Sequence, residues 1–150
     1  MGTEEEAAAG EAPTRPTKRV RLTWTGEGLA FRGGAPGGPE TVIDGDGRAG
    51  PSPMDALLLS LSGCMGADVR HILDRSRVPV EALEVEIEGV RAAAHPRRYQ
   101  ELRLVFRLEG PSEEDQPRVE RAVELSRERY CSVLHTLQPD LELEIGIERV

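Results

Sequence analysis

One long apolar segment, Ser52 to Arg77, constrains the fold more than any other feature of this chain. Ser52, Pro53 and Asp55 form an N-cap serine, a first-turn proline and an acidic third residue, a combination typical of a helix start. From Met54 to Ala67 leucines are interleaved with serines and glycines, so almost no face suits water and small residues allow close backbone approach. We therefore expect a helix whose first half is buried on all sides.

The second half of the segment is amphipathic and has a clear end. Apolar Val69 and Ile72 alternate with charged residues as far as Val78, which precedes Pro79 and so ends the helix. Cys64 lies near the middle of the segment. Its sulfur is therefore expected deep inside the domain.

Composition narrows the class of protein. A chain of 150 residues with 38% hydrophobic side chains has the size of one globular domain. A net charge of −8, with arginines scattered among carboxylates, argues against a nucleic-acid partner. No apolar run reaches the roughly 18 to 20 residues of a membrane span, and the N-terminus lacks the pattern of a secretion signal. We expect a cytoplasmic protein with no membrane partner, whose two cysteines are reduced thiols.

The remaining elements follow from periodicity. Residues 1–17 are acidic and lack apolar periodicity, so we expect a flexible tail followed by one domain over residues 18–150. Alternating or β-branched segments predict strands at 18–24, 29–32, 41–43, 83–87, 102–108 and 141–147, and a second helical stripe runs from Ser112 to Leu137. Glutamates on one strand and arginines on its neighbour predict ion pairs on a wet outer face. The order indicates an α+β fold, an antiparallel sheet curved over a buried central helix.

Two cysteines on predicted helices allow three interpretations. Cys64 and Cys131 could be packed free thiols, since cysteine is often buried. They could belong to a metal site, because Cys131 and His135 share a helix face and His71 lies two turns beyond Cys64, although no Cys-x-x-Cys or His-x-x-x-His motif is present. They could also be a redox pair, which needs a nearby cation at one sulfur. Composition alone leaves all three open.

The cysteine motifs resemble those of a known family. The run from Gly50 to Met65 reads GPSPMDALLLSLSGCM, Asp68 and Val69 follow it, and a second motif, RYCSV, surrounds Cys131. Together they are similar to the OsmC/Ohr family of thiol-dependent hydroperoxide reductases, especially its OsmC-like branch. The similarity in element order spans about residues 18 to 150.

The resemblance implies an oxidoreductase of the oxidative stress response. In this family an intertwined homodimer carries two active sites at the subunit interface, which implies Cys64 as the peroxidatic nucleophile and Cys131 as the resolving thiol. The implied substrates are organic hydroperoxides, with hydrogen peroxide reduced less well. The implied peroxidase needs no cofactor and no metal, and a dithiol reductant reopens its disulfide.

The chain departs from the Ohr pattern at two supporting positions. Met54 stands where that branch has a glutamate, which leaves Asp55 as the neighbouring carboxylate. About 13 Å of helical rise separates Asp55 from Cys64, so Asp55 can serve only another subunit's site, and its alternative role is to cap the helix. No arginine matches the one in the first Ohr hairpin, and Arg32 is the substitute we predict, with Arg48 a weaker candidate.

Two other function classes remain to be tested. A non-catalytic protein of the same fold would hold a small apolar ligand at the dimer cleft. A structural or metal-binding protein is the third class. Peroxide-dependent loss of two thiols distinguishes the enzyme from both.

Overall fold

The computed structural model describes residues 14–150, so most of the predicted acidic tail, residues 1–13, lies outside the described residues. The chain forms two compact units that divide after Gly50, and each is described by itself. The N-terminal unit is an antiparallel sheet of three strands, β1 (Arg21–Trp24), β2 (Ala30–Gly34) and β3 (Thr41–Asp44). All three strands were expected from the sequence. The prediction of one domain over residues 18–150 stays a prediction.

The strands of the N-terminal unit leave large apolar side chains uncovered. Alternation predicted that the first strand is half-buried, and within this chain that is wrong, because every residue of β1 is exposed. Trp24 is 55% exposed and Phe31, its partner in the register, is 40% exposed. A sheet of three short strands has no second layer of its own to cover these rings.

A buried carboxylate closes the end of this sheet. Asp44, at the end of β3, accepts hydrogen bonds from the backbone N–H groups of Asp46, Arg48 and Ala49. These bonds favour the ionised carboxylate and lower the pKa of Asp44. The turn after β3 is therefore held by one side chain.

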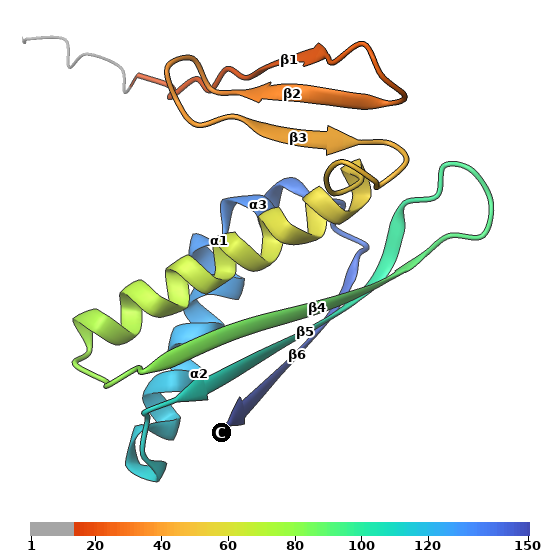
Figure 1. Ribbon diagram of the computed structural model, residues 1–150. Helices are drawn as coiled ribbons and strands as arrows, with labels where there is room; N and C mark the ends of the chain where they lie inside the picture. The colour runs from red at the N-terminus through yellow and green to blue at the C-terminus, as the bar shows by residue number, and fades with distance from the viewer. Residues whose placement is uncertain (1–13) are drawn as a thin grey trace, which may run out of the picture. The chain divides into compact units, whose positions relative to one another are not determined.

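The C-terminal unit places helices on one face of a second sheet (Figure 1). Its elements are α1 (Pro53–Arg75), β4 (Ala82–Arg91), β5 (Tyr99–Glu109), a 3₁₀ turn (Glu113–Asp115), α2 (Gln116–Leu125), a π-helical turn (Ser126–Tyr130), α3 (Ser132–Thr136) and β6 (Glu142–Arg149). The sheet order is β4, β5, β6. The α+β fold class and the long central helix are as predicted.

One strand direction differs from the prediction. β4 and β5 are antiparallel as expected, whereas β6 runs parallel to β5. A parallel neighbour requires a crossover connection, and the helical segment from α2 to α3 returns the chain to the starting end of β5. Alternation along the last strand specifies its buried face but not its direction.

The core lies between α1 and this sheet. Leu61, Met65, Val69 and Leu73 repeat every fourth residue along α1 and are fully buried. They pack with the inward residues of β5 and of α2, which are Leu102, Leu104, Phe106, Leu108, Val119 and Ala122. A Cβ added at Gly66 would lie 3.2 Å from a methyl of Val85, so this glycine lets α1 approach β4 closely.

The opposite face of the sheet carries the predicted ion pairs. Arg107 on β5 contacts Glu84 and Glu86 on β4 at 2.7 and 2.8 Å. It also contacts Glu148 on β6 at 2.8 Å. The prediction of charge pairing across a wet face is confirmed.

Helix α1 is not buried on all sides within one chain. Leu59 is 61% exposed, and Ser60, Gly63 and Ala67 are exposed on the same side. Within one chain the predicted complete burial is not reached, because the sheet and the short helices cover only part of the helix. What remains is a stripe of small residues with one large leucine.

Helix α1 also corrects the expectation that no segment of the chain could span a membrane. By length and composition alone, α1 is long and apolar enough to cross a membrane, although the sequence was expected to contain no such segment. The structure instead packs α1 along the sheet through its fully buried side chains. This is the position of a core helix in a globular unit.

The second predicted helix is interrupted in the middle. Between Ser126 and Tyr130 the backbone makes a π-helical turn, and the N–H of Cys131 bonds to the carbonyl of Ser126 at 2.9 Å. A π turn adds one residue and rotates the next part of the chain, so Cys131 points inward while Tyr130 is 47% exposed. The predicted stripe through Tyr130 therefore fails at this turn.

Candidate functional site

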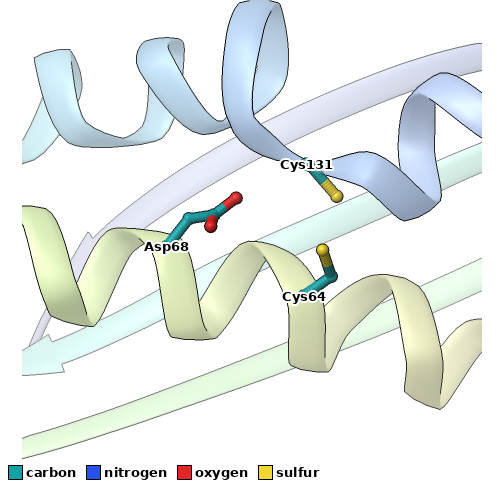
Figure 2. A group of neighbouring side chains, drawn as sticks. All are labelled: Cys64, Asp68 and Cys131. Atoms are coloured by element: carbon teal, nitrogen blue, oxygen red, sulfur yellow. The ribbon is translucent and has the colours of Figure 1, made fainter. Parts of the chain in front are cut away.

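The two cysteines meet between α1 and the start of α3. Cys64 lies in the middle of α1, and Cys131 is the N-cap residue of α3. Figure 2 shows the two sulfur atoms pointing toward each other, and they lie within 4.8 Å. Both are free thiols in this structure. A disulfide between them requires the sulfurs to close to about 2.05 Å.

The burial of the two sulfurs differs from the expectation that the Cys64 sulfur lies deep inside the domain. Cys64 is only partly buried, whereas Cys131 is completely buried. The reason lies in the helices: Cys64 borders the exposed side of α1 at Gly63, and the π turn directs Cys131 into the core. The more accessible sulfur is therefore Cys64.

Burial also distinguishes the chemistry of Cys131. Desolvation raises the pKa of Cys131 to about 11, although the N–H of Leu134 donates to its sulfur at 3.4 Å and opposes the shift. The hydrogen bond with Cys64 and the charges of Cys64 and Asp68 contribute to the same rise as smaller causes. Cys131 therefore keeps its proton at neutral pH and is suited to act after the other sulfur.

Sequence reasoning missed Asp68 as a member of this site. Its carboxylate lies within 4.8 Å of both sulfurs, and Figure 2 shows it on the same side of α1 as Cys64. The hydroxyl of Ser126, in the π turn, donates to Asp68 at 2.9 Å and holds it. Its spacing of four residues from Cys64 was the available signal, because such residues share a helix face.

The cluster also revises which residues could hold a metal. The structure brings together Cys64, Asp68 and Cys131, not the cysteine–histidine pairs considered from the sequence. The Nε2 atom of His135 lies 3.1 Å from the carbonyl oxygen of Arg127, and His71 is exposed. Neither histidine belongs to this group of ligand atoms.

An apolar cavity of about 440 Å³ lies against the first half of α1. Leu57 and Leu61 line it, and Cys64 follows Leu61 by three residues on the same side of the helix. The other apolar wall residues are Met54, Leu58, Tyr99, Leu102, Leu137 and Leu141, and Arg91, His95, Arg97 and Arg98 also line the cavity. The cavity therefore suits an apolar molecule, and its wall at Leu61 lies about one helical turn from Cys64, although none of the three cluster residues lines it.

The two supporting residues predicted from the sequence lie elsewhere. Asp55 forms the predicted capping box at the start of α1, where its carboxylate accepts from the Ser52 hydroxyl at 2.6 Å. It is not part of the Cys64 cluster, as helical geometry required. Arg32 lies on β2 in the N-terminal unit, with Arg48 in the turn after β3. The catalytic roles of Asp55 and Arg32 stay predictions.

Comparisons with known proteins agree with the motifs. A family model described as OsmC-like protein matches residues 44–146, a range that contains both cysteines and Asp68. Protein YhfA of Escherichia coli (strain K12) is 35% identical over 133 residues, which cover 88% of this chain and 98% of YhfA.

Solved structures share the fold. A hypothetical protein of Aquifex aeolicus VF5 superposes with a TM-score of 0.79 at 32% identity, covering 91% of this chain and 98% of its own. An organic hydroperoxide resistance protein OsmC of Legionella pneumophila has a TM-score of 0.64 over 91% of this chain and 99% of its own. At 12% identity, the second similarity supports the fold alone.

Proposed function

Because this chain belongs to the OsmC-like protein family, we propose that it is a thiol-dependent peroxidase that reduces organic hydroperoxides. The observation that carries the proposal is the pair of facing sulfurs, one partly accessible and one buried, and the helix that holds Cys64 also lines an apolar cavity. Organic hydroperoxide resistance proteins are among the proteins that share this fold. We place this activity in the cytoplasm, where thiols remain reduced.

The proposed first step uses the accessible sulfur. The Cys64 thiolate attacks the terminal oxygen of the hydroperoxide, the O–O bond breaks, and the departing alkoxide takes a proton to become an alcohol. Cys64 is left as a sulfenic acid. We assign the organic group of the substrate to the apolar cavity about one helical turn along α1, which favours a hydrophobic hydroperoxide over hydrogen peroxide.

The second step uses the buried sulfur. Cys131 loses its proton, and its sulfur attacks the Cys64 sulfur. The S–S bond forms as the S–O bond of the sulfenic acid breaks, and the oxygen leaves as water. The short separation of the two sulfurs supports this step within one chain. A dithiol reductant of unknown identity then reopens the disulfide.

A cation is needed near Cys64 to favour its thiolate. We assign this role to Arg32, whose guanidinium takes part in none of the ion pairs formed within residues 14–150. Asp55 is assigned to the other subunit's site, because the helix separates it from its own Cys64.

Stopped-flow mixing of reduced protein tests the proposed activity. We expect an organic hydroperoxide to react faster than hydrogen peroxide, because only the former gains from burial of its apolar group in the cavity. Two thiols per chain should disappear with one equivalent of peroxide. Equal rates for the two peroxides would contradict the role of the cavity.

A second candidate function is non-catalytic binding of a small apolar ligand. The cavity favours it, since its apolar lining would bind such a molecule without any thiol chemistry. Tight binding of an apolar molecule together with unchanged thiols after peroxide addition would support this function over the peroxidase.

We further propose that the active form is a homodimer. Leu59, Trp24 and Phe31 are 61%, 55% and 40% exposed within one chain, which is costly for such large side chains. The small residues Ser60, Gly63 and Ala67 beside Leu59 would let a second copy approach α1 closely. Each of these surfaces, taken by itself, suits contact with a second copy of the chain.

Light scattering should give a dimer at micromolar concentration for the wild-type protein and a monomer for Gly63→Gln. A Cβ at Gly63 meets no atom within 4 Å in one chain, so the monomer tolerates the side chain while a close interface does not. Asp74→Gln, exposed farther along α1, is the control and should remain dimeric. A monomeric wild-type protein would rule out the proposed assembly.

A further inference from the structure

The cluster at the two cysteines has the ligand set of a metal site as well as of a redox pair. The two sulfurs and one oxygen of Asp68 all lie within 4.8 Å of one another. We propose that the reduced cluster of Cys64, Asp68 and Cys131 is a binding site for an exchangeable thiophilic divalent cation of the Zn²⁺ type. The sequence predicts no resident metal, and the proposal concerns an ion that binds and leaves.

The geometry fits a tetrahedral ion. Zinc binds thiolate sulfur at about 2.3 Å and carboxylate oxygen at about 2.0–2.2 Å, which places neighbouring ligand atoms about 3.6–3.8 Å apart. The observed limit of 4.8 Å allows this arrangement after small side-chain rotations. Three protein ligands leave a fourth position for water, and the partial exposure of Cys64 provides an entry path.

The surrounding hydrogen bonds orient two of the ligands. The Ser126 hydroxyl donates to one oxygen of Asp68 at 2.9 Å, which leaves the other oxygen for the ion. The Leu134 N–H donates to the Cys131 sulfur at 3.4 Å, and this contact would stabilise a bound thiolate. Such contacts around the ligands are a regular feature of protein metal sites.

The charges of the cluster also favour a cation. Among the ion pairs formed within residues 14–150, none includes Asp68. Binding would replace the two thiol protons and release them to solvent, so the net charge of the cluster stays the same and the carboxylate becomes a ligand of the ion. Binding does not depend on the proposed function. The consequence of binding does depend on it, because coordination of both sulfurs would compete with their reaction with peroxide.

Cobalt titration of the reduced, full-length protein tests the site. We expect one Co²⁺ per chain, with the thiolate-to-cobalt absorption and visible bands of a tetrahedral site, and displacement by Zn²⁺. Cys64→Ser and Cys131→Ser should each weaken these bands. Asp68→Asn should bind at least about tenfold more weakly. Asp74→Asn is the matched control, since Asp74 is exposed on the same helix and paired with Arg70, and its affinity should equal the wild type.

Two results would overturn the proposal. Absence of stoichiometric cobalt bands in the reduced wild-type protein would show that no such site exists. Wild-type affinity in Asp68→Asn would show that the carboxylate is not a ligand. The proposed peroxidase fails separately, since a protein that binds cobalt but leaves organic hydroperoxide intact would keep the metal site and lose the enzyme.

Discussion

Cys64→Ser is expected to abolish peroxide consumption, whereas Cys131→Ser should complete one turnover and then stop. A serine hydroxyl at position 64 cannot replace a thiolate as the nucleophile, so the loss should be complete. Without Cys131 the sulfenic acid at Cys64 has no resolving thiol and remains or oxidises further. Mass spectrometry should show Cys131→Ser gaining one or two oxygen atoms at Cys64.

The two variants control for each other. Both remove one sulfur from the same cluster. The far-ultraviolet circular dichroism of each variant shows whether a loss of activity comes from a general loss of folding. Wild-type peroxide consumption by Cys64→Ser would show that the reaction does not start at this sulfur. Sustained turnover by Cys131→Ser, with no added oxygen, would show that Cys131 is not the resolving thiol.

The rate of disulfide formation should rise by about tenfold per pH unit between pH 7 and pH 9. The attacking species is the Cys131 thiolate, and burial raises the pKa of Cys131 to about 11, so its thiolate fraction is small throughout this range. After Cys64 is oxidised its charge no longer contributes, but desolvation, the largest cause, still holds this pKa above its usual value of 9.0.

Double-mixing stopped flow measures this step separately from peroxide reduction. Reduced protein is mixed with one equivalent of organic hydroperoxide, and the pH is changed before resolution, with a metal chelator present throughout. Cys131→Ser supplies the control in which the phase is absent. A resolution rate that stays constant from pH 7 to pH 9 would contradict attack by a buried thiol of raised pKa.

The fold was largely predictable because its elements have strong local signals. The capping box at Ser52 and Asp55 marks the start of α1, and alternation marks β4, β5 and β6. Alternation cannot specify whether a strand runs parallel to its neighbour, so the direction of β6 was missed. Apolar composition likewise cannot specify which partner covers a surface, and Leu59 therefore proved exposed within one chain.

The site was predictable only in part. The motifs around Cys64 and Cys131 indicated the cysteine pair, and the structure brings the two sulfurs together. The π turn after α2 has no clear signature in the sequence, although it decides that Cys131 is the buried sulfur. Asp68 stands with Val69 in the family motif but was not assigned to the site, because its proximity to Cys131 depends on that same turn.

The most direct test of the central claim is the connectivity of the oxidised protein. Reduced wild-type protein is treated with one equivalent of an organic hydroperoxide, the remaining thiols are blocked, and peptides are identified by mass spectrometry without reduction. The proposed mechanism predicts one Cys64–Cys131 disulfide within each chain, with no disulfide between chains. Oxidised protein in which both thiols are still free for alkylation, or in which Cys64 joins two chains, would contradict it.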